Sequence, residues 1–217
     1  MTCCCSSVSD AVERQFNAKK ATKELARYRA KGPEPTTRLL LTGLTKAGPL
    51  EGRLLDIGSG IGALTFELLD RGLTSSVGVD LSSAHVATAS TEASRRNQSD
   101  FTRFVQGDFV DVASQLPAAD IVALDRVVCC YPEFERLLDE SLRHANRYFA
   151  FSYPRDLWYV RAWVGLENLR RQITRNTFRS FVHPVSAMEH VIHRSGFTRL
   201  SHSCTRTWCA GVYTRSA

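Results

Sequence analysis

Residues 53–62, Arg-Leu-Leu-Asp-Ile-Gly-Ser-Gly-Ile-Gly, constrain the fold of this chain more than any other stretch. A short apolar run ends in an acid, Asp56, and glycine then occupies every second position. The pattern predicts a buried strand, a tight turn through Gly58, Gly60 and Gly62, and a helix after the turn. Because glycine has no Cβ, such a turn lets a ligand lie directly against main-chain atoms. The sequence therefore predicts a site for a nucleotide-like cofactor.

The spacing of the loop distinguishes between kinds of cofactor. A dinucleotide fingerprint needs Gly-x-Gly-x-x-Gly and a P-loop needs Gly-Lys-Ser/Thr at its end, and residues 58–63 supply neither. An acid before the loop repels phosphate and attracts a cationic ligand. S-adenosylmethionine carries a sulfonium, an ammonium and a carboxylate but no phosphate. The loop thus favours S-adenosylmethionine as the cofactor, with S-adenosylhomocysteine as the product.

The Asp56-x-Gly58-x-Gly60-x-Gly62 segment resembles the first motif of the class I S-adenosylmethionine-dependent methyltransferases. Three further stretches, 76–80, 106–109 and 121–126, stand where that family has its other motifs. The resemblance implies ribose binding at the second, adenine contact at the third and the floor of the active site at the fourth. It assigns to the cofactor Asp56, Gly58, Ser59, Gly60, Gly62, Asp80, Leu81, Asp108, Phe109, Asp125 and Arg126.

A plainer interpretation of the acids stays open. Strand-end carboxylates are common in any α/β domain, where Asp80 would be a solvated turn residue and Asp125 would cap the turn that follows it.

The order of apolar runs predicts the fold class. Strands are expected near 53–57, 76–80, 102–106, 119–125 and 147–153, and helices near 61–71, 83–97 and 133–144. Their alternation indicates a parallel sheet with right-handed crossovers. A helix at 186–195 and strands at 197–205 and 208–214 resemble the reversed end of the family's sheet. We expect an α/β, Rossmann-like, doubly wound and mostly parallel seven-stranded sheet with a reversed last strand and an N-terminal helical cap.

The chain divides by pattern into two parts. Residues 1–49 are expected to form the helical cap, with helices within 8–30 and over Thr36–Leu44, and residues 50–217 the cofactor-binding methyltransferase domain. A helical insertion at about 155–184 contains Trp158, Trp163 and several arginines. It either shapes the substrate pocket or packs on the sheet edge with its arginines solvated; peripheral membrane contact is a further interpretation.

Charge is distributed unevenly along the chain. Lys and Arg outnumber Asp and Glu by nine to four over residues 1–49 and by twelve to three over 143–217, whereas the acids lead by fifteen to seven between them. Basic flanks around an acidic cofactor-binding half indicate an anionic substrate or surface. We expect a methyltransferase that acts on a small anionic or aromatic molecule. Nucleic acid is disfavoured because the basic residues are not interleaved with the signatures of RNA modules. No apolar run is long enough to span a bilayer, no secretory signal is seen, and a cytoplasmic protein is expected.

The seven cysteines are expected to be free thiols in a reducing compartment. Neither Cys129–Cys130 nor Cys204 with Cys209 has the two-residue spacing of a zinc site, and Cys3–Cys5 are consecutive. No metal site is predicted.

Methyl transfer from a sulfonium is an in-line displacement, so positioning of the acceptor should dominate catalysis. A phenol or alcohol acceptor needs a general base, but a carboxylate does not. The polar residues expected near the pocket are Tyr28, Asp125, Tyr131 and His183, of which Tyr28, Tyr131 and His183 are the catalytic candidates. For His183, which precedes Pro184, a structural role in a loop is the alternative.

A narrower resemblance is to magnesium-protoporphyrin O-methyltransferase-like small-molecule methyltransferases. It rests on Arg27-Tyr28-Arg29, the glycine loop and Tyr131-Pro132. That enzyme has a histidine directly before Tyr-Pro and this chain has Cys130, so no porphyrin is assigned. The other functions left open are an RNA or protein methyltransferase that docks through basic flanks, a non-catalytic binding protein, and metalloid methylation through the cysteines. The sequence leaves the oligomeric state undetermined.

Overall fold

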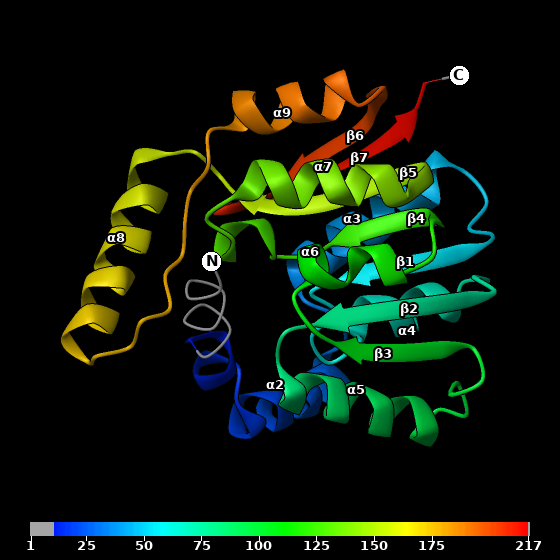
Figure 1. The fold of residues 1–217 in the computed structure, drawn as a ribbon, viewed down its shortest axis with the longest axis horizontal. Helices are drawn as coiled ribbons and strands as arrows, with labels where there is room; N and C mark the ends of the chain where they lie inside the picture. The colour runs from blue at the N-terminus through cyan, green and yellow to red at the C-terminus, as the bar shows by residue number, and fades with distance from the viewer. Residues whose placement is uncertain (1–10, 217) are drawn as a thin grey trace.

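The computed structural model describes residues 11–216. Its centre is a seven-stranded sheet in the order β3-β2-β1-β4-β5-β7-β6 (Figure 1). Strands β1 to β5 are parallel, and β7 runs antiparallel to both β5 and β6. The expected fold class, with its reversed last strand, is confirmed. The strands are β1 (Arg53–Ile57), β2 (Ser75–Asp80), β3 (Thr102–Gln106), β4 (Ala119–Leu124), β5 (Ala145–Pro154), β6 (Phe197–Cys204) and β7 (Trp208–Arg215).

Helices cover both faces of the sheet because its central strands are apolar on both sides. Residues 11–15 are helical, and residues 1–10 of the expected cap lie outside the described part of the chain. The helices that follow are α2 (Ala18–Lys31), α3 (Pro35–Ala47), α4 (Ala63–Leu69), α5 (Ser83–Arg95), α6 (Phe109–Val112), α7 (Phe134–His144), α8 (Trp158–Ile173) and α9 (Val185–Arg194).

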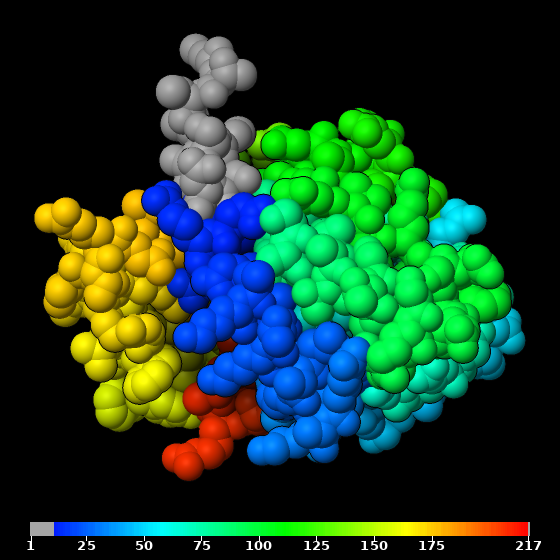
Figure 2. Space-filling model, turned by 90° about the horizontal axis from the view of Figure 1, so that it is seen from below, coloured from blue at the N-terminus to red at the C-terminus, as the bar shows by residue number. Residues whose placement is uncertain are grey.

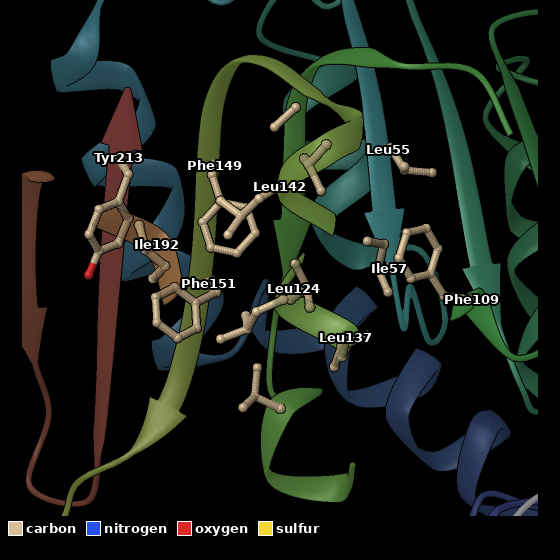
Figure 3. Close-up of a cluster of buried hydrophobic side chains, with 14 of the residues drawn as sticks. Leu55, Ile57, Phe109, Leu124, Leu137, Leu142, Phe149, Phe151, Ile192 and Tyr213 are labelled. Carbon is tan, nitrogen blue, oxygen red and sulfur yellow. The ribbon is translucent and has the colours of Figure 1, made fainter. Parts of the chain in front are cut away.

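The larger core lies between the sheet and helices α6, α7 and α9 (Figure 3). Leu137 and Leu142 of α7 and Ile192 of α9 meet Phe149 and Phe151 of β5, and all five side chains are buried. On the opposite face, the leucines of α3 and α4 pack on β1, β4 and β5. These two layers fix the sheet rigidly, so the loops at its edges are held in defined positions.

The carboxyl ends of the parallel strands point to the side of the molecule where α8 stands (Figure 1). The N-terminal helical segment lies between α8 and the rest of the molecule (Figure 2). Helix α8 carries little of the core, since Val160 is its only buried residue. In a doubly wound sheet, ligands bind outside the carboxyl ends of the strands. The site is therefore expected between the strand ends, α2 and the segment around α8.

Candidate active site

The glycine loop between β1 and α4 turns as the sequence predicts. Gly58, Gly60 and Gly62 have φ values of 66°, 53° and 80°, a region that favours glycine. The amide groups of Gly58 and Ser59 donate to the carbonyl of Val79 at 2.7 and 3.1 Å, which ties the loop to β2. A Cβ on Gly58 would lie 2.4 Å from Cγ2 of Val127. The loop is thus held against both neighbouring strands with its backbone facing a cavity.

That cavity has a volume of about 300 Å³ and lies along the carboxyl edge of the sheet. Its lining comes from the ends of β1, β2, β3 and β4, from the N-terminal helices, and from the segment after α8. Of the residues predicted to bind cofactor, it contains Gly58, Gly60, Asp80, Leu81, Asp108, Phe109, Asp125 and Arg126. The structure therefore brings eight of the eleven predicted residues to one cavity.

Asp80 is held in place by the backbone. Its carboxylate accepts hydrogen bonds from the amides of Gly60 and Ser82, each at 2.8 Å. Burial raises the pKa of Asp80 despite these two bonds. Each carboxylate oxygen has a second lone pair free for a ligand hydroxyl group.

Buried His85 pairs with the partly exposed Glu24 next to Asp80. Nε2 of His85 lies 3.0 Å from Oε2 of Glu24, and Nδ1 lies 3.1 Å from the carbonyl of Phe16. Burial alone would lower the pKa of His85, but the bond to Glu24 and the charge of Asp80 outweigh it and raise the pKa. The pair joins α2 to α5 at the edge of the cavity.

Tyr131 and Asp108 meet across the cavity. The Tyr131 hydroxyl lies 3.3 Å from both carboxylate oxygens of Asp108, which also accepts from the amide of Val110 at 3.0 Å. Burial, followed by the charge of Asp108, raises the pKa of Tyr131, so this phenol stays protonated at neutral pH. Among the three catalytic candidates, Tyr131 is the one that lines the cavity.

The turn after β4 places Asp125 and Arg126, whose charged groups lie 4.0 Å apart, in the lining of the cavity. Asp125 accepts from the hydroxyls of Ser152, at 2.6 Å, and Thr37. Arg126 has a φ of 63°, and its amide donates to Ser152 Oγ at 2.8 Å. A positive φ of this size strains the backbone of a residue that has a side chain, and such strain is concentrated at functional sites.

Three cations gather where the cavity meets α2 and α8. Lys20, Arg126 and Arg171 all line it and act electrostatically on one another and on Cys130. Burial lowers the pKa of Lys20 although Glu24 favours its charged form. Arg171 donates to Asn168 and Ser180 through Nη1, while its buried Nε has no partner among the described residues. We call Lys20, Arg126 and Arg171 the cationic cluster.

Three predicted cofactor residues lie around the cavity rather than in its lining. Asp56 is buried below the loop, where it accepts from Thr65 Oγ1 at 2.8 Å. Burial raises the pKa of Asp56 to about 7. Ser59 is buried with its hydroxyl unpartnered among the described residues, and Gly62 begins α4 against Phe66.

The structure does not bring two of the catalytic candidates to the cavity. Tyr28 is buried in the cluster of α2 with α4 and α5, and its hydroxyl contacts Glu67 and Arg96 at 3.2 Å. His183 lies 3.1 and 3.0 Å from the carbonyls of Val128 and Tyr131 through Nε2. Burial lowers the pKa of His183. Both side chains therefore connect separate segments of the chain. For His183 this is the structural role in a loop that the sequence left open as the alternative to catalysis.

The expectation of free thiols is wrong for one pair of cysteines. Cys204 and Cys209 are opposite each other in the β6–β7 hairpin and form a disulfide with an S–S distance of 1.94 Å. His202 lies beside them. A ring nitrogen of His202 and the two sulfur atoms all lie within 4.8 Å of one another. The disulfide leaves neither sulfur as a thiolate ligand. Cys129 and Cys130 are free and line the cavity, and Cys3–Cys5 lie outside the described residues.

Several cavity residues were missed by sequence reasoning, namely Phe16, Lys20, Glu24, His85 and Trp208. They belong to segments far apart in the chain and carry no local motif. Arg171 belongs to the insertion at about 155–184, for which a role in the substrate pocket was one of the two interpretations, but the sequence does not distinguish it from the other arginines there.

Known proteins resemble this chain in part of its sequence and in its fold. Residues 55–147 match the family model of a methyltransferase domain. No curated protein is similar enough in sequence to count as a relative. Magnesium protoporphyrin IX methyltransferase from Synechocystis PCC 6803, solved with bound S-adenosylhomocysteine, has a TM-score of 0.70 at 20% identity, covering 96% of this chain and all of that one.

Two further solved structures show how widely the fold is used. A putative sarcosine dimethylglycine methyltransferase from Galdieria sulphuraria has a TM-score of 0.65 at 13% identity, over 83% of this chain and 85% of that one. The [4+2]-cyclase SpnF has a TM-score of 0.63 at 14% identity, over 83% of this chain and 82% of that one. At these identities the likeness concerns the fold alone.

The matched domain and the fold agree with each other. Residues 55–147 match a methyltransferase domain. The whole chain has the reversed seven-stranded sheet and the glycine loop, and its fold is similar to that of solved S-adenosylmethionine-dependent methyltransferases.

Proposed function

We propose that this chain transfers a methyl group by in-line displacement from S-adenosylmethionine to a small anionic molecule bound at the cationic cluster. The observation that carries the proposal is that one cavity is lined by two chemically different groups of residues. The first group is the glycine loop with Asp80, Asp108 and Phe109, and the second is the cationic cluster.

The residues of the first group fit S-adenosylmethionine. Asp80 offers lone pairs to the ribose hydroxyls, Phe109 offers an apolar wall beside Asp108 for the adenine, and Gly58 and Gly60 expose main chain without a Cβ. When bound, this cofactor supplies an electrophilic methyl group on a sulfonium. The three residues outside the lining act indirectly: Asp56 secures α4 through Thr65, while Ser59 and Gly62 shape the turn.

The residues of the second group fit an oxyanion. Two acids lie close to them: Asp125 is 4.0 Å from Arg126, and Glu24, which also pairs with His85, acts electrostatically on Lys20. The three cations outnumber these two acids, so the cationic cluster keeps an excess of positive charge. A ligand carboxylate would offset the mutual repulsion of the three cations.

The chemistry of the lining favours a carboxylate oxygen as the methyl acceptor. Tyr131 remains protonated and His85 is committed to Glu24, so neither is placed to remove a proton at neutral pH. A carboxylate has already lost its proton there and needs no base. Catalysis by this chain then consists of holding the acceptor in line and keeping water out.

The test is a labelled methyl donor offered with paired carboxylic acids and their neutral amides. We expect label in the acids alone, with Arg171→Gln raising KM for an accepted acid by at least about tenfold, the value of a lost charge-assisted hydrogen bond. The control is Arg161→Gln on the same helix, outside the cavity and paired with Asp156.

Two results would oppose the assignment. Equal labelling of amides and acids would remove the need for an anion. A weaker affinity for S-adenosylhomocysteine in Arg171→Gln, at unchanged KM for the acceptor, would assign this cation to the cofactor instead.

A further inference from the structure

Helix α8 presents its most apolar side to solvent. The described residues include eight large apolar side chains that are exposed, and six of these lie on α8. They are Trp158 at 81% exposure, Tyr159 at 38%, Trp163 at 64%, Leu166 at 59%, Leu169 at 52% and Ile173 at 74%. A surface helix ordinarily turns its apolar stripe to the core, so this arrangement is inverted.

The exposed side chains form one continuous surface. Trp158, Leu166, Leu169 and Ile173 follow one another with exposed Ala162 at spacings of three or four residues, which places them on one side of the helix. Tyr159 and Trp163 extend the same side, and we call these seven residues the α8 face. Contiguous apolar patches of this kind mark sites of protein or membrane contact.

The opposite side of α8 is fixed to the protein. Val160 is buried, and Asn168 binds the backbone of Ser180 through a donated bond of 2.8 Å and an accepted bond of 3.0 Å. Arg171 bonds Ser180 and lines the cavity. The helix therefore cannot turn its apolar side inward without breaking these bonds.

Charge indicates what covers the α8 face. Residues 155–184 hold six arginines against two acids, and three of these arginines, Arg161, Arg170 and Arg175, are exposed. The acids Asp156 and Glu167 pair with Arg161 and Arg170, so the exposed surface keeps a positive charge. A second copy of this chain would bring like charges together, which opposes self-association through this surface. A bilayer with anionic headgroups offers both the apolar layer for the tryptophans and the charge for the arginines.

We propose that the α8 face docks on the surface of an anionic lipid bilayer, with helix α8 lying in the plane of the interface. No helix in the described part of the chain is long and apolar enough to cross a membrane, so the contact is peripheral. Tryptophan rings sit at headgroup depth, and arginines reach the lipid phosphates. Because Arg171 lines the cavity from the other side of the helix, docking sets the cavity beside the bilayer. The inference concerns lipid binding alone and does not depend on the methyl acceptor.

The test is co-sedimentation of the full chain with phosphatidylcholine vesicles that contain or lack phosphatidylglycerol. The wild type should bind the anionic vesicles, and Trp163→Ser/Ile173→Ser should weaken this binding by at least about tenfold. The matched control, Phe101→Ser/Leu200→Ser, removes two exposed apolar side chains elsewhere and should bind as the wild type does. Arg175→Gln should weaken binding to the anionic vesicles alone, by up to about fivefold.

Folding is verified separately by thermal denaturation and by S-adenosylhomocysteine affinity, which should match the wild type in every variant. Absence of binding to either vesicle, or binding that the α8 changes leave intact, would overturn the proposal. Sedimentation equilibrium without lipid provides a further arm. A wild-type dimer that becomes monomeric in Trp163→Ser/Ile173→Ser, with no vesicle binding, would assign the face to a second copy.

Discussion

At Gly58 the fold leaves no room for a side chain. Its φ is 66° and a Cβ would collide with Val127, so Gly58→Ala should destabilise the protein by about 1–3 kcal/mol and weaken S-adenosylmethionine binding. Gly165 on α8 has no positive φ, and a methyl group at its Cα would meet nothing within 4 Å. Gly165→Ala should stabilise by about 0.5–1 kcal/mol. Urea denaturation compares the two, and equal effects would contradict the role given to the loop.

The raised pKa of Asp56 predicts how the free energy of unfolding depends on pH. Burial raises its folded pKa to about 7, above an unfolded value of about 3.9, so the folded state retains a proton that the unfolded state loses. The contribution of this group is favourable below about pH 4 and is lost as pH rises to about 7. Relative to Asp56→Asn, the unliganded wild type should lose on the order of 3 kcal/mol across that window.

The measurement for Asp56 is the difference in unfolding free energy between the two proteins, taken by urea denaturation at several pH values. A difference that stays constant with pH would show that Asp56 is ionised in the folded protein.

The limits of sequence reasoning are clearest for single residues. Asp80 and Asp108 were found because Asp80 ends β2 and Asp108 closely follows the end of β3, and parallel strand ends meet at one edge of the sheet. Lys20 and Arg171 meet in the cavity although some 150 positions separate them, and no local pattern encodes that proximity. Tyr28 shows the opposite case. Its motif was visible in the sequence, but its side chain is buried where α2 packs against α4 and α5 and does not reach the cavity.

At the scale of elements, the β6–β7 hairpin is joined by the Cys204–Cys209 disulfide across a short loop. Chain entropy for so short a loop gives about 2 kcal/mol of stabilisation. Dithiothreitol should therefore lower the unfolding free energy by about that amount, and Cys204→Ser/Cys209→Ser should be insensitive to it. If reductant affects both proteins equally, these cysteines are free in solution.

Helices α7 and α8 should respond oppositely to loss of a leucine side chain. Leu142 of α7 is 1% exposed in the main core, so Leu142→Ala should cost about 2–5 kcal/mol. Leu166 of α8 is exposed, and Leu166→Ala should change stability by no more than about 0.5 kcal/mol. Thermal denaturation measures both, and a large loss for Leu166→Ala would show that α8 packs on protein in solution.

Element positions were largely predictable because apolar runs and turn residues mark them locally. The expected strand 53–57 and helix 133–144 agree with β1 and α7 to within a residue. The sequence also predicted the helical insertion at about 155–184, which contains α8, but periodicity does not specify which side of a helix faces the core. That is why the exposed α8 face, with Leu169 and Ile173 on it, appeared only in the structure.

At the scale of the whole molecule, the cavity brings together Asp80, Asp108 and Asp125 from the ends of β2, β3 and β4 with Lys20 and Arg171 from the basic flanks. In the proposed function these two groups bind different molecules, the methyl donor and the acceptor. The two affinities should therefore be separable by mutation.

Calorimetry of S-adenosylmethionine binding tests the central claim most directly. Asp80 lines the cavity at the end of β2, whereas Asp100 is an exposed residue of the loop before β3. The account predicts that the wild type and Asp100→Ala bind the cofactor equally and that Asp80→Ala loses at least about tenfold in affinity. A wild type that does not bind S-adenosylmethionine, or an Asp80→Ala variant that binds it as well as Asp100→Ala does, would contradict the account.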